Sequence, residues 1–155
     1  MAIEAVRTYM KQWNAQDRII EFDVSSATVE LAAQAVGCEA ARIAKTLSFL
    51  ADETPILIVA AGDRKIDNHK YKEQFHTKAK MLTPQQAIDL VGHAVGGVCP
   101  FAVKEGVVVY LDESLKRFET VFPAAGSSNS AIEVTMEELE QFSGSSRWID
   151  VCKEA

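Results

Sequence analysis

The chain has 155 residues, of which 48% are hydrophobic and 25% are charged, and its formal net charge is −6. A chain of this length forms one domain, residues 1–155, with a substantial core that needs no metal or disulfide. The acidic balance excludes a protein that coats nucleic acid, because such binding depends on many Lys and Arg contacts to phosphates. It leaves room for a small local RNA site.

The bulk sequence also predicts a cytoplasmic protein without a membrane anchor. No apolar run approaches the roughly 18 residues that a membrane span requires. The first residues lack the basic and apolar segments of a secretory signal. Cys38, Cys99 and Cys152 have no metal-type spacing and are expected to be reduced thiols. We expect a monomer or a homodimer.

The first half of the chain predicts short helices and strands in irregular alternation. An apolar stripe at three- and four-residue spacing indicates an opening helix: Ile3, Val6, Met10, Trp13. Thr28 and Gly37 are the expected N-cap and C′ residue of a second helix. Further helices are expected over 39–43 and 67–75, and strands over 19–22, 45–50 and 56–61. The run 56–61 is apolar throughout, which suits a buried central strand.

The second half contains two capping boxes. Thr83 and Gln86, with Pro84 at the first helical position, predict a helix that runs to Val91 and ends at Gly92. A second box at 135–138 opens the last helix. A short helix is expected over 112–118, and strands over 107–111, 120–122, 131–134 and 148–152. These elements predict a mixed α/β domain with a curved, largely antiparallel sheet surrounded by short helices.

A loop rich in glycine follows the helix that ends at Gly92. Gly96 and Gly97 permit positive φ angles and a close approach of the backbone to a ligand, and Pro100 restricts the residue before it. Such a loop can present main-chain amides to a small polar group. The alternative is a tight, buried turn between a helix and a strand.

Three side chains in or before this loop invite chemical interpretations. Cys99 and His93 are six residues apart, which allows a thiol nucleophile with a neighbouring base; the alternative is a buried cysteine. Lys45 lies in the apolar segment 43–50, where it is either an ordinary solvent-facing strand lysine or a functional ammonium.

The order of several short motifs resembles a known family. The motifs are Val36-Gly37-Cys38, Ile43-Ala44-Lys45-Thr46-Leu47, Gly62-Asp63-Arg64-Lys65-Ile66-Asp67, the loop from Gly96 to Pro100, and Ala125-Gly126-Ser127. In this order they resemble the YbaK family of aminoacyl-tRNA deacylases, which are related to the editing domain inserted in bacterial prolyl-tRNA synthetases. The resemblance covers most of the chain.

The resemblance implies where the site lies. It assigns catalysis to Lys45 together with the backbone of Gly96 and Gly97, and substrate binding to their neighbours and a second segment: His93, Val98, Cys99, Pro100, Gly126, Ser127. Without the resemblance, the 126–130 segment would be interpreted as a solvated turn. No His, Cys, Asp or Glu cluster has metal-ligand spacing, and nucleotide-binding motifs are missing, so we expect no metal and no cofactor.

The implied function is hydrolysis in trans of the ester bond of a mischarged aminoacyl-tRNA, of the Cys-tRNA(Pro) or Ala-tRNA(Pro) type. The implied partners are the acceptor end of aminoacyl-tRNA and prolyl-tRNA synthetase, with no membrane. Two alternatives remain at this point: a non-catalytic module that binds aminoacyl-tRNA or a synthetase, and a thiol hydrolase that depends on Cys99.

Overall fold

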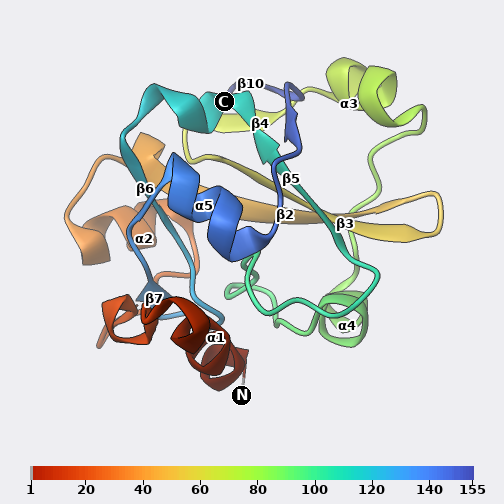
Figure 1. The fold of residues 1–155 in the computed structure, drawn as a ribbon. Helices are drawn as coiled ribbons and strands as arrows, with labels where there is room; N and C mark the ends of the chain where they lie inside the picture. The colour runs from red at the N-terminus through yellow and green to blue at the C-terminus, as the bar shows by residue number, and fades with distance from the viewer. Residues whose placement is uncertain (1) are drawn as a thin grey trace.

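A computed structural model describes residues 2–155 and has a long antiparallel pair of strands at its centre (Figure 1). β2 (Ile43–Ala51) pairs with β3 (Thr54–Ala61), with Ala44 opposite Ala61 at one end and Ala51 opposite Thr54 at the other. In the turn between them Asp52 takes a φ of 55°. This pair carries the segment around Lys45, so its position fixes where any site at that lysine lies.

The central pair belongs to a six-stranded sheet with the order β8-β6-β2-β3-β5-β9. The other strands of this sheet are β5 (Val108–Asp112), β6 (Thr120–Pro123), β8 (Val134–Thr135) and β9 (Trp148–Ile149). The mixed α/β class is confirmed. Within the sheet the long pair β2–β3 and the pair β6–β8 are antiparallel, whereas β6–β2, β3–β5 and β5–β9 are parallel.

Two predicted strands are each divided in the structure. The segment 131–134 becomes β7 (Ser130–Ala131), which pairs with β1 (Ile20–Glu21), and β8, which pairs with β6. The segment 148–152 becomes β9 and β10 (Cys152–Glu154), and β10 pairs with β4 (Arg64–Ile66). The second break lies where the Val151 amide donates to the side-chain carboxylate of Asp112 in β5, at 3.0 Å, rather than to a main-chain carbonyl.

The expected helix boundaries are confirmed by their caps. Asp67 and Thr83 accept backbone N–H groups as N-caps, as do Thr28 and Thr135. The α-helices are α1 (Ala2–Met10), α2 (Val29–Val36), α3 (Asn68–Phe75), α4 (Pro84–Gln86) and α5 (Met136–Ser143). The 3₁₀ turns are η1 (Lys11–Trp13), η2 (Gln16–Arg18), η3 (Ala40–Arg42) and η5 (Glu113–Arg117). The helix opened by the box at Thr83 continues as a π-helical turn, η4 (Ala87–Val91).

β3 is buried on both faces, as its apolar run predicts. Leu57, Val59 and Ala61 pack in one core cluster, which also contains residues of α1 and α5. Ile56, Ile58 and Ala60 pack in a second cluster, together with Tyr71 of α3. Because side chains alternate across a strand, α1 and α5 pack on one face of the sheet, and α3 and β10 pack on the other. Figure 1 shows α1 below the central pair and α3, β4 and β10 above it.

Candidate functional site

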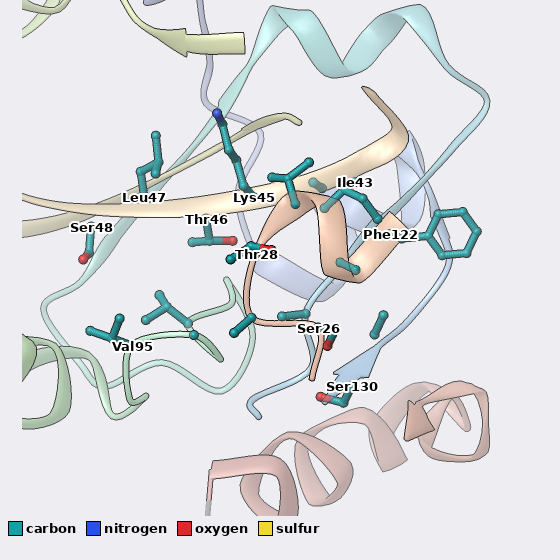
Figure 2. Close-up of a pocket in the computed structure, with 18 of the residues that line it drawn as sticks. Ser26, Thr28, Ile43, Lys45, Thr46, Leu47, Ser48, Val95, Phe122 and Ser130 are labelled. Atoms are coloured by element: carbon teal, nitrogen blue, oxygen red, sulfur yellow. The ribbon is translucent and has the colours of Figure 1, made fainter. Parts of the chain in front are cut away.

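A pocket of about 320 Å³ lies along β2, between the N-terminal end of α2 and the loop that follows η4 (Figure 2). Its lining comes from five parts of the chain: Ser26, Ala27, Thr28, Val29 and Ala32; Ile43, Ala44, Lys45, Thr46, Leu47 and Ser48; Met81 and Leu82; Val95, Gly96 and Val98; Phe122, Ala124, Ser130 and Ala131. The volume suits a small ligand group. Among these lining residues Lys45 is the one ionisable side chain, and the other polar side chains are hydroxyls.

Most of the hydroxyls that line the pocket are already engaged. Thr28 Oγ1 accepts from the Leu31 amide at 3.2 Å as the cap of α2, and Ser26 Oγ donates to the Ser128 carbonyl at 3.3 Å. Ser130 Oγ accepts from Ser127 Oγ at 2.7 Å. These hydrogen bonds fix the walls of the pocket rather than leave groups free for a ligand.

Thr46 differs from the other lining hydroxyls. Its Oγ1 is buried and has no hydrogen-bond partner among the described residues. A buried hydroxyl without a partner costs about 1–3 kcal/mol. Figure 2 shows Thr46 and Ser48 on the same side of β2 as Val95. Thr46 was not singled out from the sequence, where a threonine in a strand is ordinary.

The main chain of Thr46 also lies at an open part of the sheet. Toward β6, β2 is paired at Ile43 and Ala44 and again at an isolated bridge between Phe49 and Met81. At this edge the Leu82 amide donates to the Ser48 carbonyl at 3.1 Å. Since alternate residues of a strand point their main-chain groups to the same edge, the Thr46 N–H and C=O face the unpaired interval.

Lys45 lies on the opposite side of β2 from Thr46, as Figure 2 shows. Its ammonium donates to the Arg64 carbonyl at the start of β4. Burial lowers the pKa of this lysine, and the nearby Cys152, Asp63 and Glu30 oppose that effect. The Lys45 stem therefore lines the pocket, while its charge lies toward β4.

The glycine-rich loop is held against the segment that follows β6. Gly96 has a φ of 94°, and a Cβ at this position would lie 3.4 Å from Ala27 and 3.5 Å from Ser128. Gly97 has no positive φ; its requirement is the close approach of Ser127, whose Cα would lie 2.7 Å from a Cβ. The positive-φ requirement thus applies to Gly96 and the close packing to Gly97.

Cys99 and His93 are close together, but they lie in the core rather than in the pocket lining. Cys99 Sγ is 3.6 Å from His93 Nε2, which donates to the Phe101 carbonyl at 2.8 Å. Complete burial raises the pKa of the Cys99 thiol to about 12, and burial lowers the pKa of His93. A thiol with this pKa is protonated at neutral pH, and a thiol is a poor nucleophile, so the geometry disfavours the thiol-hydrolase alternative.

The pocket brings together part of the predicted site. Lys45, Gly96 and Val98 line it, and Gly97 lies behind Gly96. The remaining predicted positions lie outside this lining, and their part in substrate binding stays a prediction: His93, Cys99, Pro100, Gly126, Ser127. Among these, Gly126 faces α1, since its Cβ would lie 2.9 Å from the Ala2 carbonyl, and Ser127 supports the lining residue Ser130.

Two further searches cover the part of the chain that the structure describes. Within residues 2–155 no three His, Cys, Asp or Glu side chains are grouped so that they could hold a metal ion. None of the helices in this range is long and apolar enough to cross a bilayer.

The sequence is similar to those of several known proteins. YwhH of Bacillus subtilis (strain 168), described as an uncharacterized protein, is 55% identical over 155 residues, which cover 99% of each chain. The proline–tRNA ligase of Lactiplantibacillus plantarum is 27% identical over 90 residues, 57% of this chain and 16% of the ligase. This second match therefore spans only a small part of that enzyme.

The fold has a solved counterpart of similar size. A crystal structure described as that of "a putative trans-editing enzyme for prolyl tRNA synthetase" superposes with a TM-score of 0.88 at 27% identity, covering 98% of this chain and 97% of the other. The model of the aminoacyl-tRNA editing domain matches residues 24–142, which include all of the pocket lining. The chain belongs to the aminoacyl-tRNA editing domain family.

Proposed function

We propose that this protein hydrolyses, in trans, the ester bond of a mischarged aminoacyl-tRNA of the Cys-tRNA(Pro) or Ala-tRNA(Pro) type. The observation that carries the proposal is the pocket along β2, which Lys45 and Gly96 both line in a member of an editing family. The family and the trans-editing neighbour support an editing role, and prolyl-tRNA synthetase is the partner that they suggest.

The chemistry asks little of the side chains. An aminoacyl ester is already an activated acyl group, so binding it in one orientation next to a water molecule removes much of the barrier. Main-chain amides of the 96–98 loop and the Lys45 ammonium would stabilise the oxyanion. The vicinal ribose hydroxyl of the substrate would help to position the water, and in a cysteinyl substrate its own thiol would replace the water as nucleophile.

In this mechanism Lys45 changes its contact. Its ammonium donates to the Arg64 carbonyl in the absence of substrate. The flexible four-carbon stem of a lysine allows the charge to rotate over the edge of β2 toward an ester bound near Thr46.

Thr46 is proposed as a substrate contact because its hydroxyl has no partner among the described residues, and its N–H and C=O face the unpaired interval of β2. Thr46→Val is expected to lower kcat/KM by roughly tenfold, the value of about one neutral hydrogen bond. The free energy of unfolding should stay the same or rise by up to about 1 kcal/mol, since an unsatisfied hydroxyl is removed. Urea unfolding and single-turnover deacylation measure the two effects.

The matched control for this variant is Thr8→Val, at an exposed position of α1. It should leave both kcat/KM and the urea midpoint unchanged. A Thr46→Val protein that is less stable and fully active would show that the hydroxyl serves the fold and contributes nothing to substrate binding.

Deacylation is expected to survive exhaustive chelation. The proposed chemistry uses amides, an ammonium and water, and it requires no metal. Rates measured before and after dialysis against EDTA should agree within about twofold. Loss of activity with EDTA and its recovery with added zinc would contradict the mechanism.

The second candidate function is a module that binds aminoacyl-tRNA without turnover. The observation that favours a binding module is that the described residues lining the pocket include no side chain that could act as a general base. The two functions separate in one experiment, because a binding module protects the ester from spontaneous hydrolysis, while the enzyme accelerates its loss.

A further inference from the structure

The charges of this acidic protein are unevenly distributed along its sequence. The segment 64–80 contains six Lys and Arg and two Asp and Glu, a formal charge of +4, in a chain whose total is −6. The remaining residues therefore sum to −10. The segment comprises β4 and α3, which lie on one side of the central sheet, and the connection from α3, which runs past β2 to α4 (Figure 1).

Two lysines of this region face each other. Lys65 of β4 is directly opposite Lys153 of β10 in an antiparallel pair, and both are exposed. Like charges in this relation destabilise a sheet. The other two pairs of this ladder do not repel each other. Ile66 is opposite Cys152, and Arg64 forms an ion pair with Glu154 at 3.6 Å.

The other free cations of the segment follow along the chain. Lys72 lies on α3, and Lys78 and Lys80 lie in the connection that leaves it; all are exposed. In the part of the chain that the structure describes, no carboxylate within 4.0 Å pairs with them or with the two facing lysines. We call Lys65, Lys72, Lys78, Lys80 and Lys153 the basic surface.

The two carboxylates of the segment contact groups other than the lysines of the basic surface. Asp67 caps α3 by accepting from the amides of His69 and Lys70, and Glu73 contacts His69 at 2.9 Å. Lys70 is paired with Asp150 at 3.0 Å. Local ion pairs therefore do not neutralise the basic surface, and an external anion is the partner that would.

Both ends of the segment adjoin the pocket. At its start, the Lys45 ammonium donates to the Arg64 carbonyl. At its end, the Lys80 carbonyl accepts from the Leu50 amide at 2.8 Å, and the next residue, Met81, lines the pocket and bridges to Phe49. The segment thus contacts β2 at both ends, and at its second end it leads directly to the pocket lining through Met81.

We infer that the basic surface binds the phosphates of the RNA helix that leads to the 3′ end held in the pocket. This inference rests on the proposed function and extends it from the ester to the body of the tRNA. Separate exposed lysines suit backbone phosphates, which need positive charge but no particular base. The acidic remainder of the protein limits RNA contact to this side, because it repels phosphates elsewhere.

The test compares two variants that remove the same charge. The triple variant Lys65→Gln, Lys72→Gln, Lys153→Gln alters the basic surface, and Lys11→Gln, Lys104→Gln, Lys116→Gln alters exposed lysines elsewhere. Substrates are an intact aminoacyl-tRNA and an aminoacylated 3′-terminal trinucleotide, which has no helix. Binding of uncharged tRNA and of poly-glutamate is measured by fluorescence anisotropy over a range of salt concentrations.

The basic-surface variant should lose roughly tenfold or more in kcat/KM on tRNA at low salt, with a salt dependence of tRNA binding shallower by about 2 in log–log slope. It should keep its rate on the trinucleotide within about twofold, as should the control variant on both substrates. Equal rates on tRNA for the two variants would overturn the inference, as would tighter binding of poly-glutamate than of tRNA by the wild type.

Failure of the proposed function has a different signature. If no aminoacyl substrate is hydrolysed by any variant, the deacylase proposal fails, and the binding of uncharged tRNA still decides the role of the basic surface. Circular dichroism and the urea midpoint of each variant confirm that it is folded.

Discussion

Lys45→Ala is expected to lower kcat/KM for deacylation by about 10²- to 10³-fold, the range for loss of one oxyanion-stabilising donor. Lys45 is the one ionisable side chain among the described residues that line the pocket, so no neighbouring group replaces its charge. Single-turnover hydrolysis of a mischarged tRNA measures the loss. The variant should remain folded, since the side chain is half-buried and contributes one hydrogen bond, to the Arg64 carbonyl.

Lys104→Ala is the matched control for this variant. Lys104 also donates its ammonium to a backbone carbonyl, that of Asp89 at 3.0 Å, but it lies outside the pocket. The Lys104→Ala variant should deacylate the mischarged tRNA at the rate of the wild type. Lys45→Arg should be impaired, because a planar guanidinium does not replace a compact ammonium. Activity of Lys45→Ala near that of the wild type would remove the proposed site.

Gly97→Val is expected to reduce turnover far more than Cys99→Ala, by about 10²-fold against less than about threefold in kcat/KM. A Cβ at position 97 would lie 2.7 Å from the Ser127 backbone, which has no flexible end to move aside. The loop would be displaced, and with it Gly96 and Val98 at the pocket. Cys99→Ala removes only a buried, protonated thiol outside the lining.

Gly144→Ala is the control that separates a general loss of stability from the local displacement of the loop expected for Gly97→Val. Gly144 ends α5 with a φ of 68° and has open space around its Cβ position. Alanine there costs about 1 kcal/mol and should leave kcat/KM unchanged for the folded fraction. An inactive Cys99→Ala together with an active Gly97→Val would replace this mechanism with the thiol-hydrolase alternative.

The local elements of this fold are encoded locally, which is why the sequence predicts them. Thr28, Asp67, Thr83 and Thr135 each satisfy amides at the start of the helix that they precede. The divisions within 131–134 and 148–152 were not predicted. They depend on which distant strand each half meets, and on the Asp112 carboxylate that receives the Val151 amide.

The site shows the same contrast. The motif around Lys45 and the glycine pair in the loop pointed to the pocket because they are unusual in composition. The orphan hydroxyl of Thr46 depends on where β6 ends and where Met81 begins to bridge β2, which no local pattern encodes. The burial of Cys99 and His93 likewise follows from packing of the whole loop.

Single-turnover deacylation tests most directly whether this protein accelerates the hydrolysis of the aminoacyl ester of a mischarged tRNA(Pro). Purified protein in excess is mixed with Ala-tRNA(Pro), Cys-tRNA(Pro) or Pro-tRNA(Pro), and the loss of labelled amino acid is followed in the presence of EDTA. We expect at least one mischarged tRNA to be deacylated faster than it hydrolyses spontaneously, and more than about tenfold faster than Pro-tRNA(Pro). Rates at or below the spontaneous rate for all three would contradict it.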